Sequence, residues 1–224
     1  MLNRAARYFP ILDELRKHVD GDCRILEIGS GPQGLGQFHS RPFIGCDIGF
    51  SAKPKAPMLP LICSGAELPF ADGSFDAVVA SDVMEHVPPS QRQRLVAETL
   101  RVAKKVAIFG FPSGADAHAV DQELFTEYQK RKVPPPGWLE EHLLYQFPER
   151  DLLGALPEGW ELTSKANESL RFHRWLMRRE ISRLWSYVFR TALVIMPAII
   201  RKGLQVFDGE PSYRIIFTAV RSSV

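Results

Sequence analysis

A glycine-rich loop directly follows an apolar strand near the start of the chain. Residues 25–34 read Ile-Leu-Glu-Ile-Gly-Ser-Gly-Pro-Gln-Gly, so Glu27 stands two places before Gly29. Glycines at the carboxyl end of a first parallel strand let a ligand approach the backbone closely. Gly29, Gly31 and Gly34 also have the spacing of a dinucleotide-binding loop, so the loop alone does not define the cofactor. The class of cofactor depends on the segments that follow.

Strand-like and helix-like patterns alternate along the chain, which predicts an α/β fold with a mostly parallel sheet. Helical spacing of apolar residues predicts helices over residues 3–19 and 91–102. Residues 112–146 read as an irregular, partly helical connection, residues 148–156 as a short helix, and residues 168–206 as mostly helical. The predicted strands are 23–28, 43–47, 59–63, 75–81, 105–111, 160–166 and 213–220.

The length of 224 residues suits one domain with a substantial insertion. We therefore expect residues 1–224 to form a single domain with cap-like segments at 112–146 and 168–206. The three cysteines are odd in number and show no CxxC spacing, which favours buried thiols in a reducing compartment. The first residues lack the apolar run of a secretory signal, so we expect a cytoplasmic protein.

Residues 64–87 carry a more specific signal. They read Ser-Gly-Ala-Glu-Leu-Pro-Phe-Ala-Asp-Gly-Ser-Phe-Asp-Ala-Val-Val-Ala-Ser-Asp-Val-Met-Glu-His-Val. This block resembles the central block of class I S-adenosylmethionine-dependent methyltransferases, in the branch often called methyltransferase type 11. The resemblance runs over residues 20–111 and implies a Rossmann-like fold, in which a seven-stranded, mostly parallel sheet has an antiparallel last strand. It also implies S-adenosyl-L-methionine as cofactor and S-adenosyl-L-homocysteine as product.

The resemblance also implies which residues bind the cofactor. In the family, the loop after the first strand holds the methionine part, the acidic end of the second strand holds the ribose, and the loop after the third strand contacts the adenine. Asp47 ends the second strand here, and a carboxylate can accept hydrogen bonds from two ribose hydroxyl groups. Ser64 replaces an aspartate of many relatives, so adenine recognition should rest on Ser64, backbone groups and apolar packing. The expected cofactor-binding residues are Glu27, Gly29, Gly31, Asp47, Ser64, Ala66, Glu67 and Ser81.

Methyl transfer is an in-line displacement at an already activated carbon, so the protein mainly aligns the reactants and excludes water. An oxygen acceptor usually needs a base, for which histidine is suited near neutral pH. The candidate catalytic residues are His86, in a Glu-His pair just beyond the fourth strand, and His142, in a segment suited to cap the pocket. No histidine or carboxylate has a close metal-ligand spacing such as HExxH, so the sequence predicts no metal.

Residues 165–202 contain nine basic and two acidic residues, interleaved with aromatic ones. A helical cover packed on the core is the first interpretation of this segment. A contact with a membrane surface or a lipid-linked acceptor is the second, because tryptophan and arginine suit that interface. A homodimer contact is a further alternative, and nucleic acid is disfavoured. The uncharged run 191–200 is shorter than the roughly 20 residues of a membrane span.

One flank of the sheet lacks the usual covering helices in the sequence. Only a short helix fits between Gly31 and Phe43, and two prolines disfavour a helix within residues 51–58. We expect residues 168–206 or a partner chain to cover that flank.

The sequence thus predicts methyl transfer to an oxygen or nitrogen of a small-molecule, glycan or lipid-linked acceptor. A protein that binds S-adenosylmethionine or S-adenosylhomocysteine without catalysis is the alternative. A dinucleotide-dependent oxidoreductase ranks third, because Leu68-Pro69-Phe70 and the pair Glu85-His86 argue against it.

Overall fold

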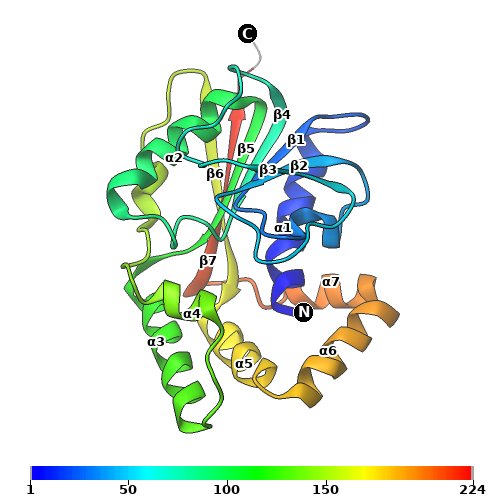
Figure 1. The fold of residues 1–224 in the computed structure, drawn as a ribbon, viewed down its shortest axis with the longest axis vertical. Coiled ribbons are helices and arrows are strands. Elements are labelled where there is room, and N and C mark those ends of the chain that lie inside the picture. The colour runs from blue at the N-terminus through cyan, green and yellow to red at the C-terminus, as the bar shows by residue number, and fades with distance from the viewer. Residues whose placement is uncertain (1, 223–224) are drawn as a thin grey trace.

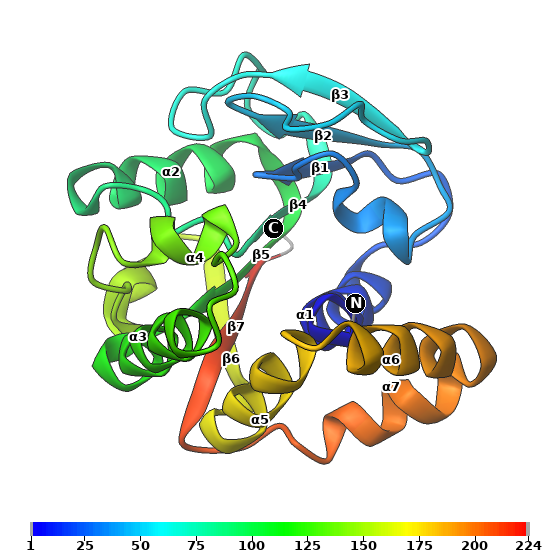
Figure 2. The same cartoon turned by 60° about the horizontal axis from the view of Figure 1, so that its bottom comes forward.

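The chain forms a seven-stranded sheet with helices on both faces (Figure 1 and Figure 2). The computed structural model describes residues 2–222. The strand order is β3-β2-β1-β4-β5-β7-β6, and only β7 runs antiparallel to its neighbours. The α/β prediction and the antiparallel last strand are therefore confirmed. The strands are β1 (Ile25–Ile28), β2 (Phe43–Asp47), β3 (Met58–Ile62), β4 (Phe75–Ser81), β5 (Ala103–Pro112), β6 (Trp160–Ser169) and β7 (Ser212–Arg221).

The helices depart from the expected pattern in two places. The connection 112–146 is more regular than expected, because it contains two helices that the proline run 134–136 separates. The expected helix within 148–156 is only a short 3-10 turn, η2 (Arg150–Leu153), and a second such turn is η1 (Gly34–Gln37). The α-helices are α1 (Leu2–His18), α2 (Pro89–Val102), α3 (Gly114–Lys130), α4 (Gly137–His142), α5 (Leu170–Glu180), α6 (Arg183–Ile195) and α7 (Pro197–Gln205).

The central strands are buried on both faces, as parallel strands between layers of helices usually are. On one face, Leu26 and Val78 pack in a core with Leu95 of α2. On the other face, Val79 packs with Ile11 of α1. Every residue of β1 is buried, which explains why this strand reads as a continuous apolar run apart from its glutamate.

The edge strand β3 is not covered by the late helices. Leu59 and Ile62 are 58% and 69% exposed. The helices α5, α6 and α7 contact α1 instead, at the end of the molecule away from the C-terminus (Figure 1). The expectation that residues 168–206 cover this flank is therefore wrong, and cover by a partner chain stays a prediction. The apolar side of these helices is already taken by α1, in a cluster that contains Leu2, Ala5, Phe9, Phe172, Leu176, Phe189 and Leu193.

A buried network of charges joins α1 to the sheet. Arg214 of β7 is 2% exposed and donates to Asp82 at 2.7 and 2.8 Å and to Glu168 at 2.8 Å. Arg7 of α1 donates to the same Asp82 carboxylate at 3.1 Å. Burial opposes ionisation of Asp82, but the two guanidinium groups outweigh it and hold its pKa well below the usual range. The network therefore remains charged and links α1, β4, β6 and β7.

We predict that Arg214→Met lowers the free energy of unfolding by about 3–5 kcal/mol, because Asp82 and Glu168 would keep buried charge with less compensation. Urea denaturation measures this loss. Arg94→Met is the control, because Arg94 pairs with Glu67 at 3.5 Å on the surface and should contribute less than about 1 kcal/mol. Equal losses in the two variants would contradict the role assigned to the network.

Candidate active site

A cavity of about 610 Å³ lies at the carboxyl ends of the central strands. In open α/β sheets, ligands bind outside these ends where the strand order reverses, here between β1 and β4. The volume is in the range of small-molecule and cofactor sites. Residues that line the cavity include Arg7, Gly29, Gly31, Asp47, Ser64, Ala66, Asp82, His86, Trp138 and Glu141.

The side chain of Glu27 holds the glycine loop in place through hydrogen bonds. Its buried carboxylate accepts hydrogen bonds from Leu35 N at 2.7 Å and from the Tyr8 hydroxyl at 2.8 Å. Burial raises the pKa of Glu27 to about 7, although both donors act in the opposite direction. Gly34 has φ +47°, and a Cβ there would overlap the Glu27 carboxylate. Glu27 therefore orders the loop and does not itself line the cavity.

The loop backbone is open to the cavity at Gly31. This residue has φ +55°, and a Cβ built on it meets no atom within 4 Å. Its backbone N–H donates to Oδ2 of Asp47 at 2.9 Å. Asp47 thus fixes the loop as well as facing the cavity, and the first of these roles was not predicted. The open backbone and the carboxylate fit the methionine and ribose parts of S-adenosylmethionine.

Five of the eight predicted cofactor residues line the cavity, and three do not. Ser64 and Ala66 line it, and Ser64 Oγ accepts a hydrogen bond from Ala66 N at 3.2 Å. The Glu67 side chain is 82% exposed and lies beside Arg94 on the surface. Ser81 is buried within the sheet, 2% exposed. The structure therefore does not bring Glu67, Ser81 or the Glu27 side chain to the cavity surface.

The two candidate catalytic histidines lie together, but only His86 lines the cavity. Their ring centroids are 4.7 Å apart. Nδ1 of His86 lies 2.9 Å from Oε2 of Glu141, and Nδ1 of His142 lies 2.6 Å from Oδ2 of Asp121. Burial, followed by repulsion from His142, lowers the pKa of His86 to about 4, so its imidazole is neutral at pH 7. His142 is buried behind it.

Sequence reasoning missed several residues of the cavity wall. Asp82 directly follows β4 within residues 64–87. Its position at the end of a predicted strand could therefore have identified it as a residue of the cavity wall. Arg7, Trp138 and Glu141 come from α1 and α4, far from that block along the chain. Only the folded chain brings these segments to one cavity.

Comparison with known families agrees with this geometry. Residues 26–111 match a family model described as a methyltransferase domain. Over these residues the chain has a methyltransferase domain of the class I, S-adenosylmethionine-dependent type. The match spans the glycine loop, Asp47 and β4, which form the half of the cavity assigned to S-adenosylmethionine. No curated protein sequence is similar enough to the methyltransferase to count as a relative.

Solved structures share the fold at low sequence identity. The [4+2]-cyclase SpnF has a TM-score of 0.56 and 15% identity, with 96% of this chain and 82% of SpnF covered. Phosphoethanolamine N-methyltransferase 2 of Haemonchus contortus, with S-adenosyl-L-methionine bound, has a TM-score of 0.52 and 17% identity, with 95% and 52% covered. Geranyl diphosphate C-methyltransferase of Streptomyces coelicolor has a TM-score of 0.52 and 14% identity, with 95% and 78% covered. Their named reactions differ, so the shared fold does not define the acceptor of this chain.

We predict that Asp47→Ala weakens binding of S-adenosylhomocysteine about 10- to 100-fold, because hydrogen bonds to a charged group contribute about 1.5–3 kcal/mol. Isothermal titration calorimetry measures the affinity. Glu67→Ala is the control and should change it by less than about twofold, since its side chain is exposed. Unchanged affinity in Asp47→Ala would refute the ribose role.

Proposed function

We propose that the methyltransferase transfers a methyl group to an oxygen or nitrogen of a small-molecule, glycan or lipid-linked acceptor. The observation that supports this acceptor class is the polar end of the cavity, where Arg7, Asp82, His86 and Glu141 meet beside Trp138. Oxygen and nitrogen acceptors usually lose a proton during transfer, and such a wall can hold a polar acceptor and help to remove that proton. His86 is the proposed catalytic residue, and His142 supports it from behind.

The proposed orientation of the cofactor follows from the order of residues along the cavity. Gly29 and Gly31 would line the methionine part, Asp47 would bind the ribose, and Ser64 and Ala66 would contact the adenine. The methionine end of the cofactor then lies on the β1 and β4 side of the cavity, where Asp82 and His86 are also found. This orientation places the activated methyl group toward the polar wall.

The test uses S-adenosylmethionine carrying a radioactive methyl group, incubated with lipid extracts and with water-soluble cell fractions. We expect label in one acceptor, whose mass rises by one methylene unit and whose fragmentation shows the methyl on oxygen or nitrogen. A methyl on carbon would refute the acceptor class. Cofactor binding without transfer to any fraction would favour the alternative of a non-catalytic binding protein.

We predict that His86→Ala slows methyl transfer about 10²- to 10⁴-fold, the usual contribution of a positioned acid or base. The affinity for S-adenosylhomocysteine should stay near that of the wild type, because His86 lies at the acceptor end. The control is His18→Ala, at the end of α1 and outside the cavity. Transfer at the wild-type rate in His86→Ala would remove this residue from the reaction.

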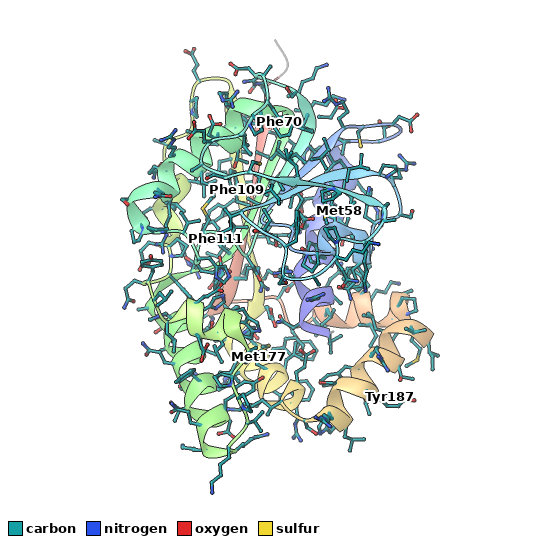
Figure 3. The ribbon with its side chains drawn as sticks, in the orientation of Figure 1. Met58, Phe70, Phe109, Phe111, Met177 and Tyr187 are labelled. Carbon is teal, nitrogen blue, oxygen red and sulfur yellow. The ribbon has the colours of Figure 1, made fainter. Side chains whose placement is uncertain are left out.

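A second surface suggests where the acceptor comes from. Apolar side chains of α6, α7 and the next turn are exposed although they are large. Ile195 is 70% exposed and Val194 is 74% exposed, while Tyr187 projects from α6 in Figure 3. The exposed set is Leu184, Tyr187, Val188, Val194, Ile195, Met196, Ile199, Val206 and Phe207. Apolar surface of this extent usually marks an interaction site.

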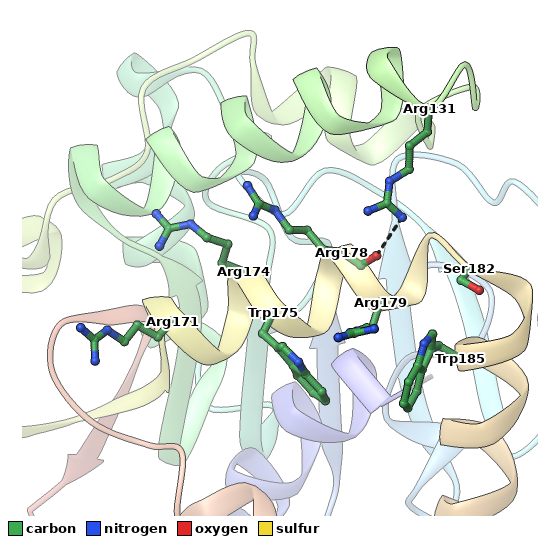
Figure 4. A pocket seen from close by; sticks show the side chains of 8 residues that line it. All are labelled: Arg131, Arg171, Arg174, Trp175, Arg178, Arg179, Ser182 and Trp185. Carbon is green, nitrogen blue, oxygen red and sulfur yellow. Dashed lines mark hydrogen bonds between the residues drawn. The ribbon is translucent and has the colours of Figure 1, made fainter.

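A basic pocket of about 640 Å³ lies beside this surface, along α5 (Figure 4). Arg179 lies 6.0 Å from the ring centre of Trp175 and 5.1 Å from that of Trp185. Arginines, tryptophans and exposed apolar residues together are typical of a helix that lies on an anionic membrane. The pocket is lined by Arg131, Arg171, Arg174, Trp175, Arg178, Arg179, Ser182 and Trp185.

We therefore propose that α5 to α7 rest on a membrane surface, and that the acceptor is lipid-linked. Within residues 2–222, no single helix has the length and apolar character to cross a membrane. The helices α6 and α7 meet those criteria only as a pair, and they are bent by 110°. This geometry suits helices that lie along a surface.

We predict that the protein co-sediments with phosphatidylglycerol vesicles and binds phosphatidylcholine vesicles more weakly. Ile195→Asp should weaken the binding about 10-fold or more, because burying an isoleucine contributes about 1.5–3 kcal/mol. Ile62→Asp is the matched control, since Ile62 is 69% exposed but lies on β3. No binding to anionic vesicles, or equal losses in both variants, would contradict the proposed surface.

A further inference from the structure

Three potential metal ligands gather behind the acceptor end of the cavity. The nearest ligand atoms of Glu85, His86 and His142 all lie within 4.8 Å of one another. Glu85 is 0% exposed, and neither of its carboxylate oxygens has a hydrogen-bond partner among residues 2–222. Burial, followed by repulsion from Asp82, raises the pKa of Glu85 well above its ordinary value. Burying a polar group without a hydrogen-bond partner costs free energy, so a ligand bound to this carboxyl group would offset that cost.

His142 presents one ring nitrogen to this carboxyl group. Its Nδ1 lies 2.6 Å from Oδ2 of Asp121, which also accepts a hydrogen bond from Tyr213 at 2.9 Å. A carboxylate oxygen at this distance from a ring nitrogen acts as the acceptor of the hydrogen bond. Nδ1 of His142 therefore carries a proton. In the neutral ring, Nε2 is then free to act as a ligand, and it lies 3.7 Å from Oε1 of Glu85.

His86 has a similar carboxylate neighbour. Its Nδ1 lies 2.9 Å from Oε2 of Glu141, within ion-pair distance but without the alignment of a hydrogen bond. Metal-binding histidines usually have a carboxylate or carbonyl group at the second ring nitrogen, which orients the ring. Both histidines of the cluster have such a neighbour, Asp121 in one case and Glu141 in the other.

We propose that Glu85, His86 and His142 form a binding site for a first-row divalent metal ion such as zinc. Two imidazoles and one carboxylate are a known ligand set for zinc and for ferrous iron. Bonds of about 2.0–2.2 Å place two tetrahedral ligands about 3.4 Å apart, close to the observed separation of His142 and Glu85. The site departs from the metal-free site that the sequence predicts, because only the fold brings His142 to the neighbouring residues Glu85 and His86.

His86 lines the cavity, so the open position of the ion would face the acceptor end. A metal ion lowers the pKa of a bound hydroxyl group and would then replace His86 in the task of favouring proton loss. This consequence rests on the proposed function, whereas the metal site itself does not.

Metal binding can be tested without cofactor or acceptor. The full-length protein is treated with a chelator, dialysed, and titrated with zinc or cobalt(II), while calorimetry and the visible spectrum of cobalt are recorded. We expect one saturable site per chain and the absorption of cobalt bound by nitrogen ligands. Elemental analysis of protein purified without a chelator should find about one equivalent of one such metal. Absence of saturable binding of both ions would overturn the proposal, whatever the outcome of the methyl-transfer assay.

Variants separate this site from adventitious binding. His86→Ala should weaken zinc affinity at least 10- to 100-fold, and His18→Ala should leave it unchanged. Glu85→Gln removes the buried carboxylate and should have the same effect. If Glu85→Gln fails to fold, His86→Ala decides, because His86 is 28% exposed and its loss is easier to accommodate. Wild-type zinc affinity in a folded His86→Ala protein would refute the site.

Discussion

The active end of the molecule depends on the ion pairs that the Asp82 carboxylate forms with two arginines. Arg214 reaches it from β7 and Arg7 from α1, and Asp82 itself follows β4 with φ +50°. The ion pairs compensate the cost of removing these charges from water, which is greatest for Arg214 because its side chain is 2% exposed. Because Arg7 and Asp82 also line the cavity, the same contacts that attach α1 to the sheet shape the site.

Different interactions hold the two halves of the site in place. On the cofactor side, Glu27 and Asp47 bind backbone N–H groups, so that the glycine loop is ordered before a ligand arrives. On the acceptor side, side chains of α1, β4 and α4 meet, and their positions depend on packing between distant segments. The first arrangement suits a cofactor common to a family. The second suits an acceptor particular to this methyltransferase.

The late helices connect the site to the outside of the molecule. They pack on α1 through one apolar side and expose another, next to the basic pocket of α5. The proposed membrane contact and the proposed metal site are independent of each other, since one rests on exposed surface and the other on buried ligands. Together with the polar cavity wall, they describe an enzyme that would take its acceptor from a lipid surface.

The sequence by itself determined the sheet, the cofactor class and six residues of the cavity, including Gly31, Asp47 and His86. These follow from local signals, because strand periodicity, a glycine loop and a strand-end carboxylate lie close together along the chain. It misplaced the cover of β3, and it gave no indication that Glu67 faces solvent. Only the tertiary structure decided that Arg7 and Glu141 share one cavity and that Glu85 and His142 meet, because contacts between distant segments depend on how helices pack, which no local pattern encodes.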